Sequence, residues 1–446
     1  MSDPHPADCV CAACGNDKDF SFPEQLLDKI ADGEVILFAG AGISTENRAH
    51  CQHTFYEEIQ AELKAPEGLS FPELMDAFCA QPDGRIKLLE KIKHRFDYFL
   101  SFDDFVRPMT RFHRSISPLY MIKDVITTNW DDFFERECRF DAFVYDSDLA
   151  FWDAAKRRVM KIHGSITNFG SIVATTGDYA QSFERLNDGP LGAQLKSLIA
   201  RKTVIYVGYS LSDENYLRLL RNIARLMQGH LRQSYLISPR IDHDKLAAAP
   251  VPLIPIQTDG AFFFERARKE LAERCEITRD EAFAKCDDFL DAVADAHNKT
   301  ADAFIRTQHP ILIFILSYQD GLIHALQRIL RMQRTGEYHS KTAVHVKIHM
   351  YEHRIEQLSK SRDYWNAAYA LGYQSGLLFL LLQSDDDDGP SPPLFDVPFS
   401  VQVRSLSGAL RYPKEKLPRF VKAQAGRILK RHPRKAKLVP DHTPYL

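Results

Sequence analysis

The stretch from Glu34 to Asn47, EVILFAGAGISTEN, constrains what this chain can fold into more than any other. The apolar and β-branched run from Val35 to Phe38 is typical of a strand buried inside a parallel sheet. Gly40 and Gly42 follow the run, and glycine lets the backbone turn tightly from a strand into the amino terminus of a helix. Because backbone amides and the helix dipole favour an anion at such a turn, the stretch predicts a phosphate-binding site.

The pattern at this turn, G-x-G-x-x-T, lacks the third glycine of the dinucleotide fingerprint, so its interpretation needs support from elsewhere in the chain. Three other apolar runs also end in small and polar residues. Their polar clusters are TTNWDD from Thr127 to Asp132, HGS from His163 to Ser165, and GYSLSDEN from Gly208 to Asn215. Since open parallel sheets bind ligands at the carboxyl ends of their strands, we interpret the four strand ends as one crevice.

The order GAGIS, T-T-N-x-D, H-G and G-Y-S-x-x-D-x-N resembles the sirtuin superfamily, and most of all its bacterial NAD-hydrolysing branch used in anti-phage defence. The resemblance covers about residues 30 to 240. It implies an α/β fold with a Rossmann-like parallel sheet and helices on both faces. It also implies that NAD is the substrate and that no metal takes part.

The resemblance further implies a role for each motif residue. Asn129 would hold the nicotinamide ribose and the attacking water, His163 would act as the base, and Asp131 would face the nicotinamide carboxamide. The other NAD-binding residues would be Gly40, Ala41, Gly42 and Ser44 at the pyrophosphate, Gly208 and Ser210 at the adenosine side, and Thr128, Asp213 and Asn215.

The residue types suit the chemistry of breaking a glycosidic bond. The amide of Asn129 both donates and accepts hydrogen bonds, so it can fix a ribose hydroxyl and a water together. A histidine such as His163 has an ordinary pKa of about 6.5 and offers a base at neutral pH. The alternatives are that His163 is a structural histidine at a strand end, and that Asn129 and Asp131 only cap the helix that follows them.

Two departures from the sirtuin pattern bear on function. The segment G-I-P-D-F-R that follows GAGIS in deacylating sirtuins is replaced by the residues from Thr45 to His50. The two C-x-x-C pairs of the sirtuin zinc ribbon are absent, since no cysteine lies between Cys138 and Cys275. The leading interpretation is therefore an NAD glycohydrolase that depletes NAD as a defence effector. The alternatives are an NAD-dependent protein deacylase and a non-catalytic nucleotide-sensing scaffold.

Composition is that of a globular protein. A chain of 446 residues is long enough for two or more domains, and its formal net charge of -3 gives no overall preference for nucleic acid. The amino terminus has no secretory pattern, and the longest apolar candidate, Leu371 to Leu382, is too short to span a membrane. We expect a cytoplasmic protein whose eight cysteines are reduced thiols. Residues 1 to 20 are expected to be a flexible tail, with zinc binding through Cys9, Cys11 and Cys14 as the alternative.

The sirtuin-like domain is expected to cover residues 21 to 275, with a helical insertion at about 70 to 113. The pattern predicts helices at 22 to 31, 54 to 63, 131 to 139, 191 to 200 and 215 to 227. It predicts further strands at 143 to 145, at 172 to 176, and at 234 to 238, the last of these being the last buried strand.

Residues 276 to 446 are expected to form a helical domain. Helices are predicted at 262 to 275, 279 to 298, 311 to 333, 344 to 361 and 364 to 383, followed by an exposed acidic and proline-rich linker at 384 to 393. The apolar faces from Ile311 to Ile315 and from Leu377 to Leu382 would either pack between copies of a homo-oligomer or complete the core of one subunit.

The stretch from Arg411 to Lys437 has eleven Lys or Arg and one acidic residue. It is interpreted either as a patch for nucleic acid or a partner, or as a solvated helix face. The resemblance to defence proteins implies a partner that is a DNA-translocating ATPase or another phage sensor.

Overall fold

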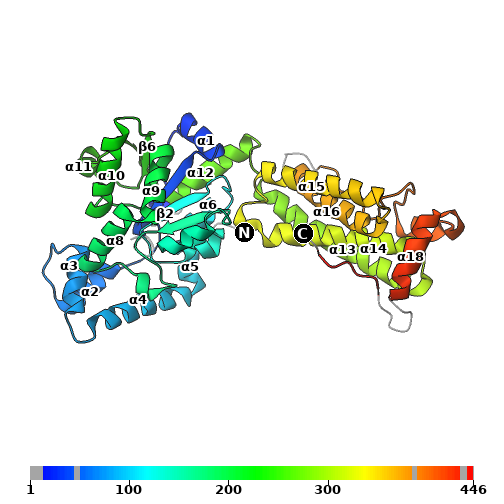
Figure 1. The fold of residues 1–446 in the computed structure, drawn as a ribbon, viewed down its shortest axis with the longest axis horizontal. Helices are drawn as coiled ribbons and strands as arrows, with labels where there is room; N and C mark the ends of the chain where they lie inside the picture. Colours follow the sequence, from blue (N-terminus) through cyan, green and yellow to red (C-terminus); the bar gives the residue numbers. More distant parts are fainter. Residues whose placement is uncertain (1–13, 45–50, 384–388, 432–438, 445–446) are drawn as a thin grey trace. The chain divides into compact units, whose positions relative to one another are not determined.

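The computed structural model describes residues 14–44, 51–383, 389–431 and 439–444. It divides the chain into two compact units, Met1–Leu271 and Ala272–Leu446 (Figure 1). The predictions for Cys9, Cys11 and the side chain of Cys14, for the loop from Thr45 to His50, and for parts of the acidic linker and the basic stretch lie outside the described residues. Among the described residues, no helix has both the length and the apolar character needed to cross a bilayer.

The amino-terminal unit is built on a sheet of seven parallel strands in the order β3-β4-β2-β1-β5-β6-β7. This confirms the predicted Rossmann-like parallel sheet. The chain passes from one half of the sheet to the other between β1 and β5, which makes their carboxyl ends the topological switch point. The strands are β1 Val35–Ala39, β2 Asp124–Thr127, β3 Asp141–Phe143, β4 Arg158–Lys161, β5 Thr203–Val207, β6 Ser234–Ile237 and β7 Leu253–Ile256.

The four motif strands are adjacent and end at the same level. Ala39 at the end of β1 pairs with Thr127 of β2 on one side and with Val207 of β5 on the other, and Thr127 pairs with Lys161 of β4. The polar clusters that follow these strands therefore emerge at one edge of the sheet.

Helices cover both faces of the sheet, because the apolar residues of each strand point alternately to either side. Phe38 and Tyr206 pack in one cluster with α9 and α10, and a Cβ on Gly260 of α12 would meet Val207 and Phe112 on the other face. The helices of this unit are α1 Glu24–Ala31, α2 Phe55–Leu63, α3 Phe71–Cys79, α4 Gly84–Leu100, α5 Asp103–Met109, α6 Arg111–Ile116, α7 Phe133–Cys138, α8 Thr176–Asp188, α9 Pro190–Arg201, α10 Glu214–Met227, α11 His243–Ala247 and α12 Gly260–Glu273.

Helices α3 to α6 lie between β1 and β2 in the chain, where a helical insertion was predicted. Figure 1 shows α2, α3 and α4 gathered at one end of the unit. Their apolar cluster includes Phe55 and Phe78, and it also contains Ile172 and the half-buried Trp130 and Ile166. The insertion thus packs against the loops that follow β2 and β4.

Several sequence predictions were wrong in detail. Residues 172 to 175 form no strand, and α8 begins at Thr176. Strand β7 lies outside β6, so the segment from Ser234 is not the last strand. The turn after β1 enters a single 3-10 turn, Ala41–Ile43, and not an α-helix.

The carboxy-terminal unit is helical, as predicted, and α13 to α16 run alongside one another (Figure 1). Two glycines allow α14 and α16 to approach closely, because a Cβ on Gly321 would lie 2.1 Å from the Tyr369 carbonyl oxygen and one on Gly372 would lie 1.9 Å from that of Tyr318. The helices are α13 Asp280–Thr307, α14 Pro310–Arg331, α15 Lys341–Lys360, α16 Tyr364–Leu382, α17 Leu406–Arg411 and α18 Arg419–Arg431.

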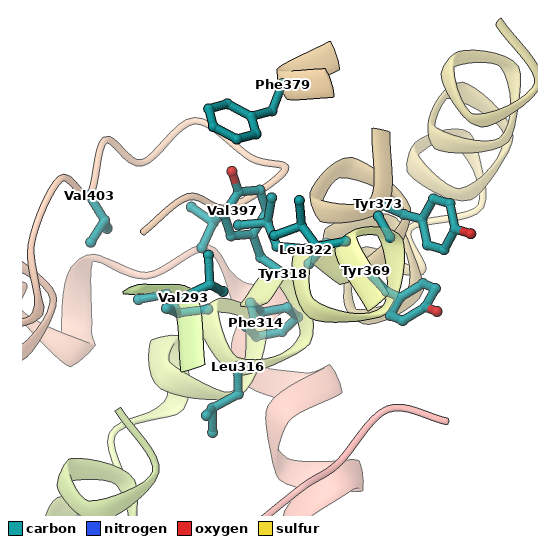
Figure 2. Close-up of a cluster of buried hydrophobic side chains, with 14 of the residues drawn as sticks. Val293, Phe314, Leu316, Tyr318, Leu322, Tyr369, Tyr373, Phe379, Val397 and Val403 are labelled. Atoms are coloured by element: carbon teal, nitrogen blue, oxygen red, sulfur yellow. The ribbon is translucent and has the colours of Figure 1, made fainter. Parts of the chain in front are cut away.

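Figure 2 shows the core of this unit, where Tyr318 and Leu322 of α14 pack near Val397, which lies in the segment between α16 and α17. The apolar run from Ile311 to Ile315 is wholly buried in this core. In the second apolar run, Leu377 is buried and Leu382 is 46% exposed. The first run therefore completes the core of its own subunit, which is the second of the two alternatives.

Candidate active site

A chain of hydrogen bonds joins the loop after β1 to the loop after β2. The Asn129 amide nitrogen donates to Ser44 Oγ over 3.1 Å, and Ser44 Oγ donates to Asp131 Oδ2 over 2.8 Å. All three side chains are buried. The other carboxylate oxygen of Asp131 accepts from the backbone amide of Phe133 at the start of α7. The structure therefore brings the predicted Ser44, Asn129 and Asp131 together.

This chain fixes the orientation of the Asn129 amide. Its nitrogen is directed to Ser44, and its oxygen, Oδ1, is buried without a hydrogen-bond partner among the described residues. An unpartnered buried acceptor is costly. Oδ1 is therefore suited to accept a hydrogen bond from a ligand hydroxyl or a water.

A buried lysine, Lys161, binds the loop that follows β2. Lys161 is fully buried at the end of β4, and its ammonium group donates to the Asp131 carbonyl oxygen and, over 3.2 Å, to Glu135 Oε1. Burial raises the pKa of Glu135, and the neighbouring Lys161 charge opposes that rise. Lys161 was not among the predicted site residues, although a lysine inside the apolar run VMKI is an available signal.

His163 pairs with a carboxylate from the loop after β5. Its Nε2 lies 3.2 Å from Asp213 Oδ2, and both side chains are about one-tenth exposed. Burial alone would raise the pKa of Asp213, but the neighbouring His163 ring and the amides of Tyr216 and Asn215 lower it below the ordinary value. A carboxylate that faces Nε2 favours the tautomer with the hydrogen on Nε2, in which Nδ1 is the basic nitrogen.

Asp213 is itself held by α10. Its Oδ1 accepts from the Tyr216 amide over 3.1 Å and so caps the helix. The chain turns sharply at two residues before Asp213: Gly208 has φ +60, and Leu211 has φ 51, which is uncommon for a residue with a bulky side chain. Asp213 was expected among the cofactor-binding residues, and its contact with His163 was not predicted.

Tyr179 packs against the His163 ring, and Asn215 holds Tyr179 in place. The Asn215 side chain donates to the Tyr179 carbonyl oxygen over 2.9 Å, which ties α10 to α8. The Tyr179 ring lies with its centroid 4.9 Å from that of His163. Asn215 is therefore engaged in positioning α8, and Tyr179 was missed because α8 was not predicted.

The glycines at the switch point are needed for a close backbone approach between β1 and β5. A Cβ on Gly40 would lie 2.4 Å from the Gly208 carbonyl oxygen, and one on Gly42 would lie 2.9 Å from the same atom. The Gly40 and Gly42 amides donate to the carbonyls of Val207 and Gly208. Among residues 40 to 44, all of them described, the Ala41 amide alone is without a backbone acceptor. The predicted phosphate turn thus has fewer backbone amides free to bind an anion than its sequence suggested.

Four contacts therefore link the four strand ends in a ring. The Ser44 chain joins β1 to β2, and the Ile166 amide joins β4 to β2 by donating to the Trp130 carbonyl over 2.7 Å. The His163 and Asp213 pair joins β4 to β5, and Gly42 joins β1 to β5.

The remaining predicted residues lie at the edge of this ring. Thr128 is half-buried and donates its amide to the Ala39 carbonyl over 3.3 Å. Ser210 is exposed, and its carbonyl accepts from Ser212 and Lys245. In the part of the chain that the structure describes, no group of three or more His, Cys, Asp or Glu side chains is arranged to hold a metal ion.

Comparison with known proteins gives two similarities. A family model described as SIR2-like domain matches residues 123–251, which include β2, β4, β5 and β6. A curated relative, Defense-associated sirtuin 2 of Bacillus subtilis, is 24% identical over 225 residues. That match covers 48% of this chain and 22% of the relative, so the similarity concerns about a fifth of the relative's length.

Proposed function

Because this chain contains a SIR2-like domain, we propose that its amino-terminal unit is an NAD glycohydrolase, which cleaves NAD to nicotinamide and ADP-ribose. The observation that carries the proposal is the arrangement of two groups at adjacent strand ends. Asn129 keeps a buried acceptor, Oδ1, that has no partner among the described residues, and His163 has Nε2 beside Asp213, which favours Nδ1 as its basic nitrogen. A site that only bound a nucleotide would need neither group.

The reaction follows from the properties of these residues. Breaking the bond between C1′ of the ribose and the nicotinamide nitrogen builds up positive charge on the sugar, so the nucleophile must be held in line with that bond. Asn129 Oδ1 accepts a hydrogen bond from the ribose or the attacking water. The water oxygen bonds to C1′, its proton passes to His163 Nδ1, and the electrons of the broken bond leave with neutral nicotinamide.

Asp213 is the positioning residue for the base in this account. Its carboxylate holds the hydrogen on Nε2 and stabilises the imidazolium that forms when Nδ1 takes the proton. Ser44 and Asp131 are the positioning residues for Asn129. Their hydrogen bonds hold its amide nitrogen away from the ligand, so its oxygen faces the ligand.

A role in anti-phage defence, with depletion of NAD as its effect, is supported by the similarity to a relative whose name describes a defence-associated sirtuin. Hydrolysis is favoured over protein deacylation because the cysteine pairs of a sirtuin zinc ribbon are missing between Cys138 and Cys275.

The test is to incubate the purified chain with NAD, with and without an acetyl-lysine peptide, and to measure nicotinamide and ADP-ribose. We expect cleavage that does not depend on the peptide. Release of nicotinamide only when the peptide is present would replace this proposal with the deacylase.

A further inference from the structure

Helix α18 presents a face of unpaired positive charge. From Arg411 to Lys430 the chain has seven Lys or Arg and one acidic residue, Glu415. The seven cationic side chains are exposed, and none forms an ion pair with a carboxylate of the described residues. The Lys422 ammonium donates to the backbone carbonyl of Glu415 over 3.0 Å.

The opposite face of α18 fixes the helix to its own unit. Val421 and Ala425 are buried in the core of the unit, and Gln424 accepts from the Tyr364 amide and donates to Asp363. The positive face is therefore held in one orientation by a packed helix.

The cations of α18 whose side chains the structure describes fall on one side of the helix. Arg419, Lys422, Arg427 and Lys430 lie within an arc of about 140° at 3.6 residues per turn, over about 16 Å of helix. Ala423 and Gly426 lie between them, and a Cβ on Gly426 would meet nothing within 4 Å. The middle of the face is thus low and open, which lets a polyanion come close to the helix backbone.

Some cations on other helices of the same unit lie in ion pairs with carboxylates of their own helix. Lys299 pairs with Asp295 on α13, and Lys360 pairs with Glu356 on α15. A helix face that only keeps a protein in solution usually carries both signs. A face of one sign on α18 is therefore better explained by an anionic partner.

The kind of partner follows from what this face lacks. The positive face has no large apolar side chain at its centre, whereas protein–protein interfaces bury apolar and aromatic anchors. It also has no exposed aromatic ring on which unpaired bases could stack. Interfaces with duplex nucleic acid are rich in positive charge and bind phosphates, and the wide major groove of B-form DNA admits a helix whereas that of A-form RNA does not.

We propose that the positive face of α18, made of Arg419, Lys422, Arg427 and Lys430 around Ala423 and Gly426, lies along the major groove of double-stranded DNA and binds the phosphates on either side of it. This binding does not depend on base sequence, and it is independent of the NAD chemistry.

The test is binding of the full chain to a fluorescent DNA duplex of about 25 base pairs over a range of salt concentrations. With the four face cations on phosphates, the logarithm of the affinity should fall with the logarithm of salt with a slope of roughly -4. The double variant K422Q/R427Q should lower that slope to about -2 and weaken binding about 60-fold at 0.1 M salt.

The matched control is R232Q/R331Q, which removes two exposed cations elsewhere and changes the net charge equally. It should bind as the unaltered chain does. Equal weakening by both variants would overturn the assignment to α18, as would the absence of duplex binding at low salt.

Two further arms separate the alternatives. Equal binding of an RNA duplex would overturn the choice of DNA. Exposed Asp287, Asp291 and Asp295 on α13 offer an acidic face that a second copy would present to α18. A mass in solution that falls with K422Q/R427Q, without a change in DNA binding, would overturn the proposal in favour of self-association.

Discussion

Replacing Asp213 with Asn separates the two tasks of this carboxylate. In the native chain, one oxygen caps α10 through the Tyr216 amide and the other faces His163 Nε2. Asparagine has one acceptor oxygen, and if that oxygen keeps the cap, its NH₂ group faces the ring. Nε2 must then accept a hydrogen bond, so the ring hydrogen moves to Nδ1 and the base is lost.

The size of the effect follows from what general-base catalysis contributes. We expect turnover to fall by about 100-fold to 10,000-fold, or roughly 3 to 5 kcal/mol of transition-state stabilisation. The KM for NAD should change little, because Asp213 contacts the histidine and the helix and not the substrate. Helix stability should also change little, because Asn is as good a cap as Asp.

The assay is the rate of nicotinamide release with saturating NAD, together with the thermal unfolding midpoint. Asp242→Asn is the matched control, because Asp242 caps α11 through the Lys245 amide in the same way and is exposed. The pH dependence of turnover should also change for Asp213→Asn and not for the control. Near-native turnover in a folded Asp213→Asn protein would refute the positioning role.

Three further predictions concern other groups. Asn129→Ala and His163→Ala should each lower turnover by about 100-fold or more without unfolding the chain; either variant with native kcat and native stability would disprove the role of that residue. Gly42→Val should raise the KM for NAD and lower the unfolding midpoint, since its Cβ would lie 2.9 Å from the Gly208 carbonyl, whereas Gly177→Ala, whose Cβ would meet only Thr175 at 3.9 Å, should do neither. Burial lowers the pKa of His113 from its ordinary 6.5 to about 4. Protonation of this ring therefore favours the unfolded chain, and about 3 kcal/mol of the free energy of unfolding should be lost as the pH falls from about 6.5 to 4. The variant His113→Leu removes two ring nitrogens that have no partner among the described residues. Denaturant titrations should show that it loses less stability than the unaltered chain over this pH range; an equal loss would contradict the assignment.

The strand ends could be predicted because their signal is local. Each of β1, β2, β4 and β5 is an apolar run that stops at small or polar residues, and four such runs in a fixed order are rarely accidental. Helices α3 to α6 also lie between β1 and β2, in the part of the chain whose sequence pattern is helical.

The rest depended on contacts between distant segments. Strand β7 was missed because it is short, contains Pro255 and lies at the sheet edge. Helix α8 was missed because few of its residues are apolar, and only Ser182 and Leu186 are buried. The pairing of His163 with Asp213 depends on the backbone turns at Gly208 and Leu211, which sequence periodicity does not reveal.

The central claim is that the amino-terminal unit hydrolyses NAD with Asn129 and His163, and its most direct test is chromatography of NAD incubated with the purified full chain. The account predicts nicotinamide and ADP-ribose in equal amounts, formed without any acylated peptide, and neither product above background with His163→Ala. NAD that stabilises the chain against unfolding but is recovered intact would contradict the claim and would identify the site as a nucleotide sensor.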